Sequence, residues 1–128
     1  MNEFGYTVKT DKSVEEAIVA VEKATAENGF MVLHIHHVDQ TLKEKGFDRE
    51  PYKIIEVCNG KFASQVLNAD IDIGLFLPCK INVYTDGGQT VISGLRPKIM
   101  GQFVENDLIE KTASDVDTII LNIIDSSK

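Results

Sequence analysis

Two segments of the chain carry apolar residues at helical spacing. Ser13 and Glu16 form the Ser-x-x-Glu pattern of a capping box, and the apolar side chains that follow recur every three or four positions. Asn28-Gly29 predicts the end of this helix, because glycine readily adopts the left-handed conformation found there. A second stripe of the same spacing fills the last part of the chain. We expect long helices at residues 13–28 and 106–124.

Between these helices the apolar residues alternate with polar ones, as in strands that bury one face. Asp86-Gly87-Gly88 is a strong hairpin signal between two such runs. Short helices are expected at 40–45 and 61–67, and the segment 68–77 is expected to be irregular or extended. The expected strands cover residues 4–8, 30–38, 52–58, 77–85 and 89–95.

This order of elements predicts one α+β domain of 128 residues. We expect an antiparallel sheet of about five to six strands, with the two long helices on one face. In the strand 30–38 the odd positions Met31, Leu33 and Ile35 are apolar, so they are expected to face the core. The opposite face of the sheet would then lack a helical cover. Its predicted lining is Val32, His34, His36, Ile54, Glu56 and Tyr84.

His34 and His36 form the first candidate site, because residues two apart share one face of a strand. With Glu56 or Cys58 on a neighbouring strand, the two imidazoles could bind a transition metal, Zn or Cu, or shuttle a proton. The alternative is a solvated polar face on a one-sided antiparallel sheet. No other cofactor signature is evident.

Cys58 and Cys79 form the second candidate, since one ends a strand and the other begins one. Their separation matches neither the Cys pairs of a zinc knuckle nor a Cys-x-x-Cys redox motif. Strand parity places them on opposite faces, Cys58 with Glu56 and Cys79 with the core. Both could simply pack as small hydrophobic side chains. Asn59, ahead of a short helix, could help present amides to an anion or could form an ordinary turn.

The charge of the chain limits its partners. The net charge is −7 and the isoelectric point is about 4.9. We therefore expect no nucleic-acid binding, which relies on clustered lysine and arginine, and no attraction to anionic membranes. No apolar run is long enough to span a bilayer. The first residues do not resemble a signal peptide, so a cytoplasmic location with reduced thiols is expected.

Several short sequence pieces together resemble a known family. They are Gly29-Phe30, residues 42–46, Glu56-Val57-Cys58-Asn59, Ala63, Gly74 and residues 77–83. In this order, over residues 4–124, they resemble the uncharacterised bacterial and archaeal "domain of unknown function 302" family. One departure is Gly60, where family members often have proline.

The resemblance implies a fold similar to a half-repeat of the TATA-box-binding protein: a strand, a helix, a four-stranded meander and a final helix. It implies no activity, because the family has none established, and fold alone does not bring DNA binding. Members of the fold family are often dimeric, so a homodimer is an expectation.

Two hypotheses about function follow. In the first, which we favour, the chain is a homo-oligomeric module that binds a small ligand or a metal without catalysis. An uncovered, partly apolar sheet face is expected to be buried against something. In the second, the chain is an enzyme or redox carrier in which Cys58 is the nucleophile, His34 or His36 the base and Glu56 its orienting group.

Overall fold

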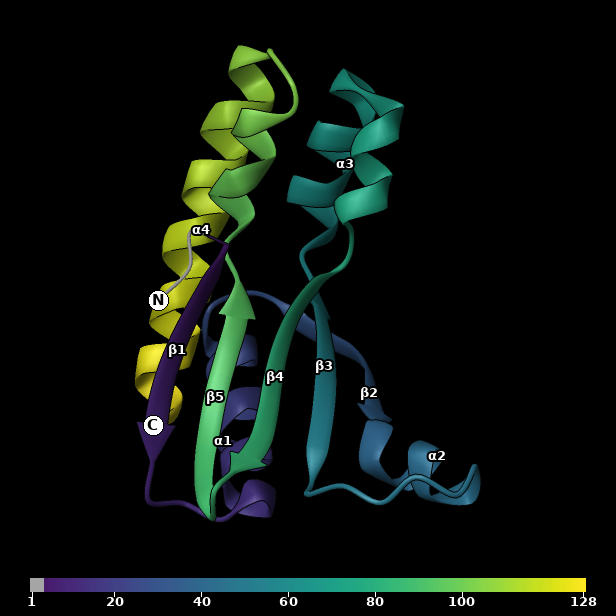
Figure 1. Cartoon of the computed structure of the whole chain (residues 1–128). Coiled ribbons are helices and arrows are strands. Elements are labelled where there is room, and N and C mark those ends of the chain that lie inside the picture. The colour runs from purple at the N-terminus through teal and green to yellow at the C-terminus, as the bar shows by residue number, and fades with distance from the viewer. Residues whose placement is uncertain (1–3) are drawn as a thin grey trace.

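The computed structural model describes residues 4–128 and contains one antiparallel sheet of five strands. The strands lie in the order β1-β5-β4-β3-β2, so β2 to β5 form a meander and β1 pairs with β5 (Figure 1). This agrees with the expected fold class and strand count. The strands are β1 (Gly5–Thr10), β2 (Met31–His37), β3 (Tyr52–Cys58), β4 (Cys79–Asp86) and β5 (Gln89–Leu95).

Helices α1 (Val14–Glu27) and α4 (Asp107–Ser127) contact each other and cover one face of the sheet (Figure 1). The core lies between the two layers. Fully buried isoleucine and valine side chains from the strands meet the apolar stripes of both helices there, as the alternating and helical spacings predicted. The central members are Val21, Ile55, Val57, Ile81, Val83, Ile92, Ile120 and Ile123.

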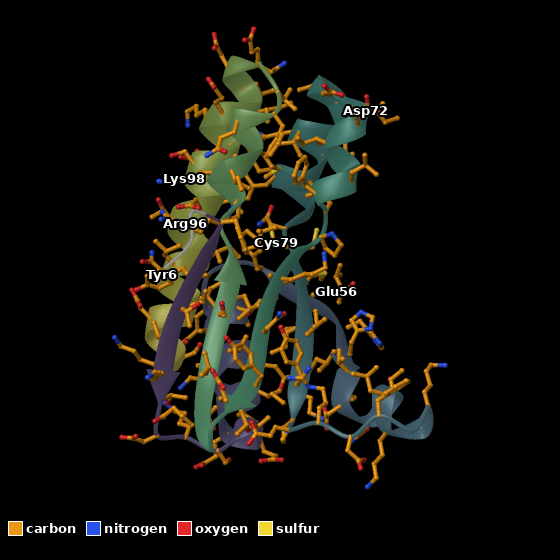
Figure 2. All side chains as sticks on the ribbon, viewed as in Figure 1. Tyr6, Glu56, Asp72, Cys79, Arg96 and Lys98 are labelled. Carbon is orange, nitrogen blue, oxygen red and sulfur yellow. The ribbon has the colours of Figure 1, made fainter. Side chains whose placement is uncertain are left out.

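Four short elements complete the chain: α2 (Val38–Glu44), α3 (Gly60–Ala69), and the 3₁₀ helices η1 (Ile71–Phe76) and η2 (Pro97–Gln102). A smaller core joins α3, η1 and η2 to the first half of α4, beyond one end of the sheet. Arg96, just before η2, binds Asp117 of α4 with 2.9 Å between nitrogen and oxygen (Figure 2). No helix in the described part of the chain is long and apolar enough to cross a membrane.

The local signals of the sequence are present at the expected places. Ser13 and Glu16 form both hydrogen bonds of the capping box. Gly29 has φ of 77°, in the left-handed region that favours glycine. Asn106 caps α4 through the amide of Ile109. The hairpin between β4 and β5 turns at Gly87 and Gly88, as predicted.

The strand β2 differs from its predicted orientation. Its pairing with β3 shifts between Val32 and His34, which is a β-bulge, so the alternation of faces changes within the strand. Val32 and Ile35 therefore pack against the core. Met31 and Leu33, expected in the core, are 62% and 50% exposed. Val32 is accordingly lost from the predicted lining of the uncovered face.

Three other expectations are wrong. The segment expected to be irregular or extended forms the 3₁₀ helix η1, with Ile73 completely buried. Residues 97–102, which lie outside every expected helix and strand, form η2. The final helix continues to Ser127, beyond its expected end at residue 124, because the Ser127 side chain is buried and donates to the carbonyl of Ile123. The likeness to the TATA-box-binding protein stays a prediction.

The opposite face of the sheet has no helix in front of it in the part of the chain that the structure describes (Figure 1). We call it the open face. Its side chains alternate with the core residues of each strand. The candidate residues of β2 and β3, His34, His36 and Glu56, lie here, and so do polar and aromatic side chains of β4 and β5.

Candidate functional site

His34, His36 and Glu56 come together as the sequence predicted. His34 is paired with Glu56 across the β2–β3 ladder, and the His36 Nε2 atom lies 3.2 Å from a Glu56 oxygen. The two imidazole rings meet edge to face, with 4.4 Å between centroids. Glu56 is marked on this side of the sheet in Figure 2.

The described structure does not identify this cluster as a metal-binding group. Among residues 4–128 there is no group of three or more His, Cys, Asp or Glu side chains placed to hold a metal ion. Cys58, the other expected ligand, is paired with Met31 and not with a histidine. The binding of Zn or Cu at His34 and His36 therefore stays a prediction.

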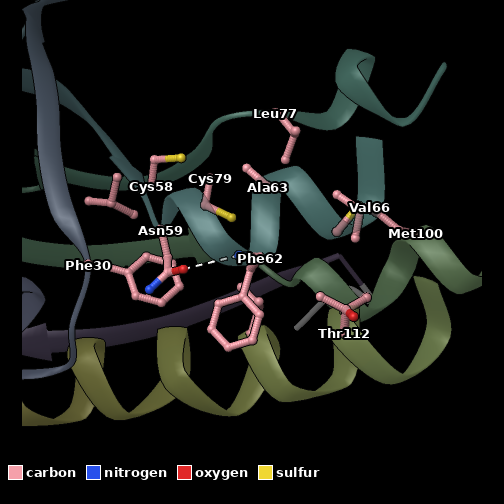
Figure 3. Close-up of a pocket in the computed structure, with 13 residues that line it drawn as sticks. Phe30, Cys58, Asn59, Phe62, Ala63, Val66, Leu77, Cys79, Met100 and Thr112 are labelled. Carbon is pink, nitrogen blue, oxygen red and sulfur yellow. Dashed lines mark hydrogen bonds between the residues drawn. The ribbon is translucent and has the colours of Figure 1, made fainter. Parts of the chain in front are cut away.

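Cys58 and Cys79 both line a small apolar cavity of about 30 Å³ where the sheet meets α3, η2 and α4 (Figure 3). The Cys79 sulfur points into the cavity toward Phe62, and the Cys58 side chain leaves its strand in another direction (Figure 3). The remaining lining is Phe30, Val57, Asn59, Ala63, Val66, Leu77, Met100, Thr112, Ala113 and Val116.

Burial weakens both thiols as acids. It raises the pKa of Cys79 to about 11, and the nearby Cys58 adds to this rise. Burial also raises the pKa of Cys58. Each thiol is therefore protonated near neutral pH, and the protonated form is not the nucleophile. In the described residues no hydrogen bond joins an imidazole to Cys58. The geometry thus gives no support to a Cys58–His pair.

Asn59 has a structural role at the start of α3. Its side-chain oxygen accepts a hydrogen bond from the Phe62 amide at 3.1 Å, which is an N-cap. Its side-chain nitrogen donates to the carbonyl of Gly29 at 2.9 Å, which ties α3 to the end of α1. Both ends of the amide are thus occupied by protein. We infer that Asn59 has a structural role, and its contact with a ligand stays a prediction.

A larger hollow lies on the open face, over β3, β4, β5 and the start of β1. We call it the open-face hollow. Its volume is about 340 Å³. The sequence predicts Tyr84 on this face but does not predict the hollow. It is lined by Phe4, Gly5, Tyr52, Lys80, Asn82, Tyr84, Ser93, Gly94 and Leu95.

Two tyrosines form one wall of the hollow. Tyr52 and Tyr84 are cross-strand partners, and their rings stack with 5.0 Å between centroids at an interplanar angle of 11°. Burial raises the pKa of Tyr84, and the neighbouring Tyr52 and Asp86 add to the rise. The phenol is therefore a neutral hydrogen-bonding group throughout the physiological range. The Arg49 guanidinium also lies over the Tyr52 ring, with 5.0 Å from its carbon to the ring centroid, so Tyr84 provides the flat apolar surface of this wall.

Asn82 lies between the tyrosines and Lys80 on the same face of β4. Its Nδ2 atom donates to the Tyr52 hydroxyl at 3.0 Å. Its Oδ1 atom is buried and, in the described structure, has no hydrogen-bond partner. Buried polar groups are nearly always paired, so an orphan of this kind calls for an explanation. Sequence parity could have placed Tyr52, Lys80 and Asn82 on one face, but only the register brings them into one hollow.

The fold and the hollow define a small α+β domain with one helix-covered and one open sheet face. The chain belongs to the family described as "Domain of unknown function DUF302", which matches residues 6–127. It is similar to a solved structure described as an uncharacterized conserved DUF302 protein from Bacillus stearothermophilus. The identity is 33% over 99% of this chain and 100% of the other, with a TM-score of 0.93. No curated protein matches the chain.

Proposed function

We propose that this protein is a non-catalytic module that binds a small molecule in the open-face hollow. The observation that carries the proposal is a hollow of about 340 Å³ on the uncovered face, lined in part by Asn82, whose amide oxygen is buried and unpaired within the described structure. Ligand sites in proteins have volumes of roughly 300–1,000 Å³ and combine mostly apolar walls with a few convergent polar groups. The open-face hollow has both properties.

The composition of the lining supports binding of a ligand with a flat apolar part. Phe4 and Leu95 provide apolar surface together with the Tyr52–Tyr84 pair. Lys80, Asn82 and Ser93 provide polar groups. The site is built on paired strands, so its shape is largely fixed before the ligand arrives, which lowers the entropic cost of binding.

The alternative, catalysis through Cys58, is less well supported. Its thiol has a raised pKa caused by burial, whereas a reactive cysteine needs a lowered one. His36 has the contact with Glu56 that this alternative expects, but in the described residues no hydrogen bond joins either imidazole to Cys58. The open-face hollow contains no arrangement of nucleophile and base among its lining residues. We therefore propose binding without covalent chemistry.

A screen of a chemically diverse fragment library by ligand-detected NMR tests this function. Ser93→Leu places bulk on the floor of the hollow and should abolish binding of the hits. Ser114→Leu is the matched control, because Ser114 is exposed on α4, on the other layer of the molecule. The proposal fails if the library gives no hits, or if the two variants retain the hits equally.

A further inference from the structure

Among the described residues that line the open-face hollow, Lys80 is the one with a cationic or anionic side chain. It is half-buried at the start of β4. The whole chain has a net charge of −7, whereas the charged side chain among the described lining residues is a cation, so this lining differs in sign from the chain as a whole. Apolar walls around a charge focus its field and strengthen its attraction for an ion of opposite sign.

The expected protein partner of Lys80 is occupied elsewhere. Glu56 is paired with Lys80 across the β3–β4 ladder, which would normally favour a cross-strand ion pair. Glu56 instead lies 3.2 Å from the Nε2 atom of His36. In residues 4–128 no carboxylate lies within ion-pair distance of the Lys80 ammonium. The Lys80 ammonium makes one hydrogen bond, to the carbonyl of Pro78 at 3.4 Å.

A second, independent observation concerns the side-chain amide of Asn82. The Tyr52 hydroxyl satisfies one end of the amide, and the other end is buried and has no partner among residues 4–128. If the oxygen and nitrogen of the Asn82 amide were exchanged, one of the two atoms would still lack a hydrogen-bond partner. As assigned, the unpaired atom is an acceptor, so it would be satisfied by an N–H or O–H donor. Because this oxygen is buried, a donor reaches it only when the surrounding side chains move.

From these observations we propose that the ligand of the open-face hollow is a small planar organic anion with a hydrogen-bond donor. Its carboxylate or phosphate binds Lys80, its flat body packs against the Tyr52–Tyr84 wall, and its donor reaches the amide of Asn82. This inference rests on the proposed function and specifies the chemical class of the ligand. The anion does not react, since binding alone is proposed.

The same geometry explains why His36 and Glu56 lie beside the hollow. By engaging Glu56, the imidazole of His36 leaves the Lys80 ammonium available for an anion. Replacement of His36 by alanine would release the Glu56 carboxylate toward Lys80, its cross-strand neighbour. His36 is thus a positioning residue that acts on the ligand through Glu56, and its effect on affinity should disappear in a Glu56→Gln background.

Titrations of the full chain followed by amide NMR test the inference with defined probes. The anionic probes are 4-hydroxybenzoate and phenyl phosphate, which distinguish a carboxylate from a phosphate. The uncharged methyl ester of 4-hydroxybenzoate and the cation tyramine have a similar ring and lack the anion. Benzoate keeps the charge and lacks the hydroxyl donor. We expect 4-hydroxybenzoate, phenyl phosphate or both to bind at least about tenfold more tightly than the ester and tyramine, as for a partly desolvated charge contact.

Lys80→Met should remove this preference, so that the better anion and the neutral ester bind equally. Lys9→Met is the matched control, because Lys9 lies on the open face of β1, is exposed and does not line the hollow. Asn82→Leu should erase the advantage of 4-hydroxybenzoate over benzoate. Thermal unfolding of each variant shows that it is folded.

The outcomes separate the two proposals. If the ester or tyramine binds as tightly as the better anion, or if Lys80→Met and Lys9→Met have the same effect, the inference is wrong although binding in the hollow stands. It is equally wrong if the anions do not bind while other fragments do. If no compound of any charge perturbs the open face, the proposed function itself is wrong.

Discussion

Replacement of Asn59 separates a structural role from a ligand-binding one. Its side chain makes two hydrogen bonds, one as the N-cap of α3 and one to the Gly29 carbonyl. Loss of an N-cap costs about 1 kcal/mol. The bond to Gly29 is exposed and should contribute about 0.5–1 kcal/mol. Asn59→Ala should therefore lower the free energy of unfolding by about 1.5–2 kcal/mol.

Asn59→Asp divides this loss into its two parts. The carboxylate can still accept from the Phe62 amide and also suits the positive end of the helix dipole, but it cannot donate to Gly29. We expect a loss of about 0.5–1 kcal/mol for this variant, roughly half of the effect of alanine. Urea unfolding followed by circular dichroism measures both values, provided that the slope with denaturant is unchanged.

Two results would refute this reasoning. If Asn59→Ala and Asn59→Asp destabilise the protein equally, the N-cap hydrogen bond makes no measurable contribution to the free energy of unfolding. If neither variant differs from the wild type by more than about 0.5 kcal/mol, the size expected of neutral surface substitutions, Asn59 has no structural role. In either case the residue would return as a candidate for ligand contact.

Further predictions concern the thiols, the acid stability and the partners. Labelling of Cys79 by a thiol reagent in the folded protein should be slow near neutral pH and should accelerate toward its pKa of about 11. Burial opposes ionisation of Asp39, but hydrogen bonds from the Tyr52 amide and the Lys53 side chain prevail and lower its pKa. A lowered pKa stabilises the folded state above the unfolded pKa, and this stability is lost as pH falls through the folded one. Asp39→Asn should therefore be less stable than the wild type at neutral pH and should lose less stability on acidification, as measured by urea unfolding at several pH values. If His34 and His36 bind Zn or Cu, elemental analysis should find stoichiometric metal that His34→Ala removes. If the chain is a homodimer, light scattering should give twice the mass of one chain, and a monomer at every concentration would contradict it.

The sequence predicted most of the fold because its signals are local. A capping box at Ser13, a terminating glycine at position 29 and the Asp86-Gly87-Gly88 hairpin each act over a few residues, so no tertiary information is needed to interpret them. The orientation of β2 was missed, because a bulge reverses the alternation at Leu33 without any glycine or proline to mark it. Strand parity is reliable only between bulges.

The candidate site was predicted only in part, for a similar reason. His34, His36 and Glu56 meet as expected, because each pair is adjacent along or across strands. The open-face hollow depends on the order β1-β5-β4-β3, which places residues far apart in the sequence next to one another. Nothing local in the sequence indicates that Glu56 bonds to His36 instead of Lys80. Because Glu56 bonds to His36, its carboxylate does not neutralise the Lys80 ammonium in the hollow.

The location of bound ligand is the most direct test of the central claim. Backbone amide signals of the isotope-labelled protein should be assigned and followed during titration with the best fragment from the library. The account predicts that the largest shifts fall on the strands around the hollow, at Tyr52, Asn82, Tyr84 and Ser93, and that α1 and the exposed face of α4 stay unchanged. Shifts centred instead on the apolar cavity at Cys79 and Phe62 would contradict it.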